Sequence, residues 1–65
     1  MKKKLTKEFY EKPALAEAVN AYKSLASITI SEDSDYYYYE IISSEYDSQL
    51  VANEFENYVL GLMNT

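Results

Sequence analysis

The spacing of apolar residues changes along the chain, and each change marks a predicted element. From Pro13 to Ala26, apolar residues recur every three or four positions, which is typical of the buried face of an α-helix. The residues of that face are Leu15, Ala18, Val19, Tyr22, Leu25 and Ala26. Pro13 suits the first turn of this helix, because the N–H that proline lacks would have no partner there.

A second helix is predicted to begin near Asp47 or Ser48. Either residue is a good N-cap, because its side-chain oxygen can accept a hydrogen bond from an N–H of the first turn. The apolar side of this helix consists of Val51, Phe55, Tyr58, Val59 and Leu62. We expect this side, with the Phe55 ring at its centre, to pack in the core.

Between the helices, residues 26–43 have the pattern of a β-hairpin. SITIS alternates with a period of two, EDSD supplies turn-forming residues at 32–35, and YYYYEIIS resumes β-forming chemistry. A four-residue loop from Glu32 to Asp35 opposes Ser31 to Tyr36, Ile30 to Tyr37, Ile28 to Tyr39 and Ala26 to Ile41. A slip of one residue would bring Glu40 beside Ile28 on the buried face, at a cost on the order of several kcal/mol.

This register divides the block of four tyrosines between two faces of the sheet. Tyr37 and Tyr39 are predicted to face the helices, and Tyr36 and Tyr38 to lie on the opposite, open face. Ile42 follows them at the same alternation. We interpret Tyr36, Tyr38 and Ile42 as a partner-binding or peptide-binding stripe, since tyrosine is enriched at interfaces and no further segment of the chain is left to cover them.

At the N-terminus, residues 4–10 (KLTKEFY) also alternate, with Leu5 and Phe9 on one side, and predict a short first strand. The Lys-rich residues 1–4 are expected to fray. The element order is therefore β-α-β-β-α. It predicts an α+β fold of one domain over residues 1–65, a small sandwich with two helices on one face of a two- or three-stranded sheet.

Composition argues against catalysis. The chain has no Cys, His or Arg and a single Gly, so thiolate and imidazole chemistry, bidentate phosphate clamps and phosphate-cradling glycine loops are all excluded. Its carboxylates fall at predicted turn and helix-surface positions, where solvation explains them better than a hydrolase site with paired acids. We expect a protein that is not an enzyme and has no catalytic residues, no metal and no cofactor.

Charge is unevenly distributed along the chain. Five of the six lysines lie in the first twelve residues, whereas eight acidic and no basic residues follow Ser24. Such a body repels the phosphate backbone of nucleic acid and favours a basic client surface. No apolar run approaches the roughly 20 residues that span a bilayer. We therefore expect no nucleic-acid or membrane partner, and a cytoplasmic location.

Three stretches together resemble the HxsD-like family: AEAVNAYKSLASITI, the polar-tipped hairpin and the ending NEFENYVLGL, of which EFENYVLG at 54–61 is the most specific part. The resemblance covers roughly residues 9–63, and this chain is shorter than typical members. Proteins of that family are small accessory subunits of radical-SAM enzymes that modify ribosomally made peptides, including the small partners of spliceases. The resemblance implies a non-catalytic subunit that helps bind the enzyme, its precursor peptide or both. The alternative is a small structural or regulatory module that self-associates, as a homodimer, without a peptide client.

Overall fold

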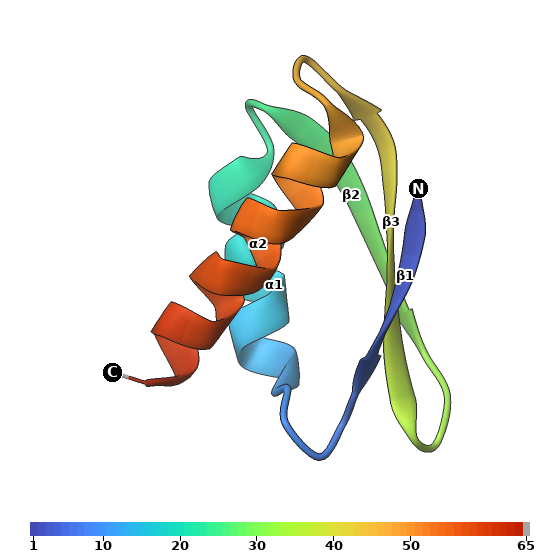
Figure 1. Cartoon of the computed structure of the whole chain (residues 1–65). Coiled ribbons are helices and arrows are strands. Elements are labelled where there is room, and N and C mark those ends of the chain that lie inside the picture. The colour runs from blue at the N-terminus through green and yellow to red at the C-terminus, as the bar shows by residue number, and fades with distance from the viewer. Residues whose placement is uncertain (65) are drawn as a thin grey trace.

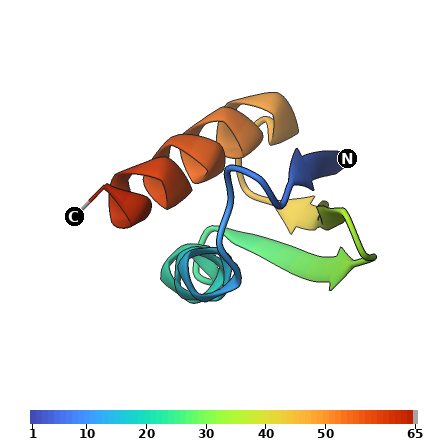
Figure 2. The ribbon, with the colours of Figure 1, turned by 90° about the horizontal axis from the view of Figure 1, so that it is seen from below.

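The structure, a computed structural model, describes residues 1–64 as three strands and two helices. Their bounds are β1 Lys2–Thr6, α1 Lys12–Tyr22, β2 Ala26–Glu32, β3 Tyr36–Ser44 and α2 Ser48–Met63. The strands form one antiparallel sheet in the order β1-β3-β2, and both helices lie against the same face of it (Figure 1). The view from below shows the two layers (Figure 2). The predicted α+β fold and element order are confirmed, and the sheet has three strands.

The core lies between the helices and the inner face of the sheet. Its buried residues are Leu5, Ala14, Leu15, Ala18, Ala26, Ile28, Tyr37, Tyr39, Ile41, Val51, Ala52, Phe55 and Val59. The Phe55 ring is fully buried and lies 4.9 Å, centroid to centroid, from the ring of Tyr39. Burial of Tyr37 and Tyr39 confirms the predicted inner face of the tyrosine block.

The helix starts follow local chemistry closely, whereas the end of α1 does not follow its periodicity. Asp47 is the N-cap of α2, because its carboxylate accepts a hydrogen bond from the Leu50 N–H at 3.1 Å. Helix α1 ends at Tyr22, short of the predicted Ala26. Ala26 instead begins β2 and is buried there. Its position fits both the helical spacing of the preceding residues and the alternation of the strand that follows, so the spacing alone could not assign it. Neither helix among residues 1–64 is long and apolar enough to cross a lipid bilayer.

The hairpin pairs two residues away from the predicted register. Ile30 opposes Tyr39 and Ile28 opposes Ile41, while β2 runs through Glu32, so the turn comprises residues 33–35. The turn is built on Asp33, whose Oδ1 accepts hydrogen bonds from the N–H groups of Asp35 and Tyr36 at 2.9 and 2.8 Å. Because side chains alternate with a period of two, this shift leaves every face unchanged. Alternation alone could not detect it.

A β-bulge near the end of the hairpin sets the position of Ile42. Ile28 pairs with Ile41 and Ser27 pairs with Ser43, which leaves Ile42 without a cross-strand partner. One extra residue on one strand is the definition of a bulge, and it bends that strand locally. Ile42 is 59% exposed at this irregularity.

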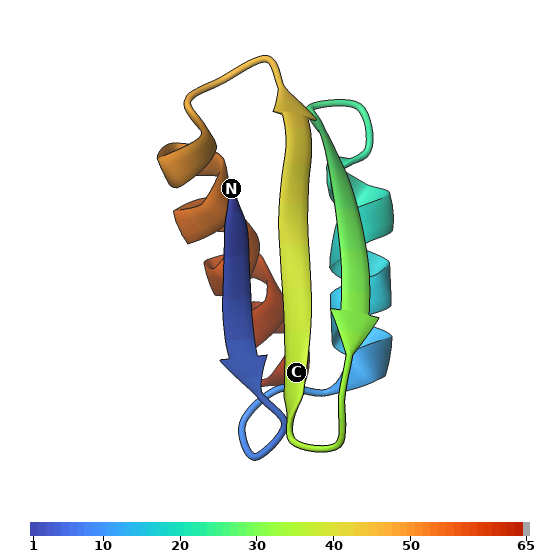
Figure 3. The ribbon, with the colours of Figure 1, turned by 90° about the vertical axis from the view of Figure 1, so that its right-hand side faces the viewer.

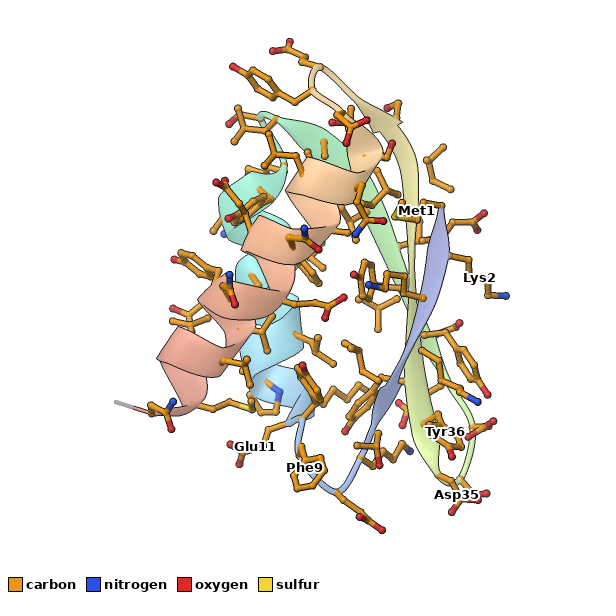
Figure 4. The ribbon with its side chains drawn as sticks, in the orientation of Figure 1. Met1, Lys2, Phe9, Glu11, Asp35 and Tyr36 are labelled. Atoms are coloured by element: carbon orange, nitrogen blue, oxygen red, sulfur yellow. The ribbon has the colours of Figure 1, made fainter. Side chains whose placement is uncertain are left out.

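The predicted bounds of the first strand are wrong. Strand β1 is Lys2–Thr6 rather than 4–10, so Lys2, Lys3 and Lys4, which were expected to fray, lie in a strand that pairs with the central strand β3. The Met1 amino group even donates to the Ile41 carbonyl at 3.2 Å. The chain turns after Thr6, whose carbonyl accepts from the Phe9 N–H, so Phe9 lies in the loop and is 71% exposed (Figure 4). Backbone pairing with β3 outweighed the polarity of the lysine side chains.

Candidate interaction surfaces

The face of the sheet that points away from the helices, seen from the front in Figure 3, carries the predicted tyrosine pair. Tyr36 and Tyr38 are half-buried there, with ring centroids 6.4 Å apart. Strand β1 runs beside them, and its lysines extend over their rings. The Lys4 Nζ lies 4.4 Å from the Tyr36 ring centroid, and the Lys2 Nζ lies 5.7 Å from that of Tyr38. The expectation that nothing in the chain would cover these rings is therefore wrong.

The Tyr38 hydroxyl is also engaged within the chain. It donates a hydrogen bond of 2.6 Å to Asp33 Oδ2 in the hairpin turn. This bond raises the pKa of Tyr38 and, together with the two backbone N–H donors, lowers the pKa of Asp33. Tyr38 thus ties the turn to β3 as well as facing outward.

The third predicted residue, Ile42, does not join the tyrosine pair. Glu40 stands between Tyr38 and Ile42 on the same face of β3 and is paired across the sheet with Lys2. We refer to Tyr36, Tyr38 and Ile42, with the lysines beside them, as the sheet face. Lys2 and Tyr36 both project from the side away from the helices (Figure 4). This face mixes basic and acidic groups, so it gives no ground for expecting a basic client.

At one end of the sheet an ion network ties the strands to the start of α1. Glu32 Oε2 lies 2.6 Å from the Lys7 Nζ, and its Oε1 lies 2.8 Å from the Lys12 Nζ. The hydrogen bonds from Lys12 and Lys7 lower the pKa of Glu32 from its ordinary 4.5 to about 2. All three side chains are solvent-accessible, so this network orders the end of the sheet more than it adds stability.

A second polar cluster joins three elements near the core. The Tyr39 hydroxyl donates a short hydrogen bond to Glu56 Oε2 of α2, and Lys3 of β1 forms an ion pair with the same oxygen at 3.2 Å. Burial, followed by the bond to Glu56, raises the pKa of Tyr39. Every member of this cluster is paired, and we assign it a structural role: it docks α2 on the sheet.

The surface that sequence reasoning missed lies on the helices. A hollow of about 260 Å³ is lined by Tyr22, Leu25, Tyr46, Leu50, Val51 and Glu54. A neighbouring hollow shares Tyr22 and Glu54 and adds Asn57 and Tyr58. We call the two together the helix groove. Tyr46 is 56% exposed, Leu50 52% and Tyr58 40%, so the groove gathers large apolar side chains that the core does not use.

One sequence signal could have found part of this groove. Leu50, Glu54 and Tyr58 recur every four residues, which places them along one side of α2, and Tyr46 lies four residues before Leu50 in the turn that precedes the helix. The buried residues Val51, Phe55 and Val59 recur at the same interval, one position further on. Beside its buried stripe, helix α2 therefore carries a second stripe in which Glu54 lies between two exposed apolar residues, Leu50 and Tyr58.

The described residues contain no cluster of acidic side chains suited to a metal: within 1–64, no three His, Cys, Asp or Glu residues lie together as potential ligands. Comparison of the chain with protein-family models, with curated proteins and with solved structures gave no significant match.

Proposed function

We propose that this protein is a non-catalytic accessory subunit that binds a radical-SAM enzyme, its ribosomally made precursor peptide, or both. The observation that carries the proposal is the helix groove. Leu50 and Tyr46 are each more than half exposed and lie beside Leu25. Contiguous exposed apolar groups of this kind mark interaction sites on small proteins. The identity of the partner rests on the resemblance of EFENYVLG, residues 54–61, to the HxsD-like family.

In this proposal the chemistry belongs to the partner enzyme, and the proposed location is the cytoplasm, where such an enzyme would meet its peptide. This chain supplies a rigid scaffold with two outward surfaces. The sheet face, with Tyr36, Tyr38 and Ile42, belongs to the sheet layer, whereas the helix groove is lined by residues of the two helices and the turns beside them. Two separate surfaces would let the enzyme and the peptide bind at the same time.

The test is co-expression of the tagged chain with a radical-SAM enzyme encoded beside it, one that carries the CxxxCxxC motif of such enzymes. We expect the two proteins to elute together and the complex to persist through size-exclusion chromatography. An enzyme that elutes alone, with and without its precursor peptide present, would rule out the proposed function.

A second candidate is self-association through the sheet, and one of the two edge strands, β2, favours it. Edge β1 carries Lys2, Lys3 and Lys4, and lysines along an edge hinder pairing with another chain. Edge β2 has only Glu32 as a charged residue, and Lys7 and Lys12 neutralise it. Light scattering on the isolated chain separates the candidates, because self-association requires a stable dimer without any partner.

A further inference from the structure

The helix groove is a preformed surface because one of its walls is also part of the core. The Tyr22 ring meets the buried Phe55 ring edge-on, with centroids 5.9 Å apart. The same Tyr22 ring meets Tyr58 at 5.6 Å, again close to edge-on. Since Phe55 is fully buried, it holds Tyr22 in place, and Tyr22 in turn holds Tyr58. These two ring contacts connect the Tyr22 and Tyr58 wall of the groove to the core.

The position of the groove decides the backbone conformation of what it binds. It lies over α2, the end of α1 and the turns beside them. Helical hydrogen bonds occupy most main-chain groups of the helices, and the N–H groups of Leu25 and Tyr46 in the turns donate to the Tyr22 carbonyl and to Ser44 Oγ. An extended peptide would find few main-chain partners there and would leave its own polar groups unpaired. A helix satisfies its backbone internally and needs only side-chain contacts. The groove thus favours a helical occupant.

Charge decides the chemistry of that occupant. Glu54 lies in the middle of the groove and lines both hollows. Its charge adds to burial in raising the pKa of the Tyr22 hydroxyl. Glu45 and Asp47 flank Tyr46 at one end, and the chain has no basic residue after Lys23. A basic side chain at the centre of the interface would relieve this excess of negative charge.

The same charge argues against a second copy of this chain as the occupant. In a two-fold dimer formed by this surface, the same patch would face itself. Glu54 stands at the middle of the patch and would then lie close to the partner's Glu54, where like charges repel. Within residues 1–64, none of the residues that line the two hollows is a lysine that could separate them, and Lys23, which lies between Tyr22 and Leu25 in the chain, lines a different hollow.

We propose that the helix groove binds an amphipathic α-helix of a protein partner, with apolar side chains over Leu50 and Tyr58 and a Lys or Arg against Glu54. This inference rests on the proposed function only in taking the occupant to be a protein. It adds the conformation of the bound segment, its charge, and the residue, Glu54, that interacts with that charge.

The first experiment uses two synthetic amphipathic helical peptides of about 18 residues, which span roughly 27 Å as helices. They share one apolar stripe and differ at the flanking position, which is Lys in one peptide and Glu in the other. Each is titrated into the 15N-labelled full chain. We expect the Lys peptide to shift amide resonances of residues 22–25 and 46–58, with little change at 36–42, and the Glu peptide to bind about tenfold more weakly.

Charge-reversed variants show whether Glu54 determines the preference for the Lys peptide. Glu54→Lys should reverse the preference, so that the Glu peptide binds about tenfold more tightly than the Lys peptide. The matched control is Glu40→Lys, the same charge change at an exposed position on the sheet face. It should leave both affinities unchanged. The charge assignment would be wrong if the two peptides shifted the groove resonances equally and bound with equal affinity, both in the native chain and in Glu54→Lys.

Two further outcomes would overturn the inference as a whole. One is the absence of resonance shifts with either peptide up to about 1 mM, a concentration at which even a weak specific site is occupied. The other is a dimer of the isolated chain that Leu50→Ser dissociates, which would make a second copy the occupant. Leu50 is largely exposed, so this variant should keep its melting temperature. If the radical-SAM enzyme still binds Leu50→Ser with unchanged affinity, the proposed function stands and the groove inference falls.

Discussion

The sheet face and the helix groove are both built around tyrosines, yet the chain treats the two surfaces differently. On the sheet face, Lys4 and Lys2 of β1 lie over the rings of Tyr36 and Tyr38. In the helix groove, Tyr46 and Leu50 remain more than half exposed, and Glu54 is the only charged residue among residues 1–64 that lines the two hollows. The difference is that another strand of the same chain covers the tyrosines of the sheet face, whereas no such cover from residues 1–64 lies over Tyr46 and Leu50. A dense block of aromatic residues in the sequence does not by itself predict an open surface.

Phe55→Ala is the substitution with the largest expected effect, because Phe55 supports both surfaces. Its ring contacts Tyr39, which is next to Tyr38 in β3, and Tyr22, which forms the wall of the groove. Truncating a buried Phe costs about 3–5 kcal/mol, and a domain this small has little more than that to lose. Urea denaturation monitored by circular dichroism should show that the variant is largely unfolded even without urea. A variant that still melts cooperatively and only loses its partner would place Phe55 at an interface instead of the core.

Asp47→Ala should act on the groove side alone. The Asp47 carboxylate caps α2 through the Leu50 N–H, and loss of such a cap costs about 1 kcal/mol. Amide hydrogen exchange should speed up in the first turn of α2 and stay unchanged in β3. Ser48→Ala is the matched control, because Ser48 is the other residue whose chemistry suits the cap. An equal loss of stability in Ser48→Ala would mean that the cap is shared.

Tyr36→Ser/Tyr38→Ser tests the sheet-face side of the comparison. Since both rings have lysine partners within the chain, and Tyr38 also bonds Asp33, we expect a lower melting temperature. Tyr46→Ser/Leu50→Ser removes two exposed groove residues and should change the melting temperature less but weaken partner binding by about tenfold or more.

Calorimetric binding to the partner enzyme, paired with thermal melts, compares the two double variants. If Tyr36→Ser/Tyr38→Ser binds the partner more weakly but melts at the same temperature, the rings beneath the lysines belong to a binding site. The expectation that only the helix groove binds the partner would then be wrong. If both double variants bind normally, neither surface contacts the enzyme.

Glu32→Gln is expected to have the smallest effect, visible mainly in acid. Folding lowers the pKa of Glu32 from 4.5 to about 2, so its ionised form contributes stability above about pH 4.5 that is lost as the pH falls toward 2. Thermal melts of the native chain should decline across that window. The Glu32→Gln variant should start lower and decline less, though Asp33, whose pKa is also lowered, still contributes. An unchanged pH profile, or one insensitive to salt, would show that the lysine pairs do not matter.

The alternation of apolar and polar residues correctly predicted which side of β2 and β3 faces the core, and the helical spacing predicted most of the buried residues of both helices. That spacing was wrong for Leu25 and Tyr58, which were expected on the buried faces of the helices and are 38% and 40% exposed. The burial of Tyr37, Tyr39, Phe55 and Val59, and a helix start at Asp47, followed from local chemistry because such patterns depend only on residues close in the chain. For the same reason, element order was enough to predict an α+β fold with both helices on one face. The partner assignment from EFENYVLG is a resemblance and stays a prediction.

Only the tertiary structure decided which residues meet across elements. A two-residue shift of the hairpin preserves every face, so the pairing of Ile28 with Ile41 depended on the turn that Asp33 builds. The lysines of β1 cover the tyrosines because backbone pairing with β3 carries them there, against the fraying that their polarity suggests. The helix groove joins residues 22–25 to residues 46–58. The spacing of Leu50, Glu54 and Tyr58 marks only the α2 side of this surface, and the groove exists only once α1 and α2 pack together.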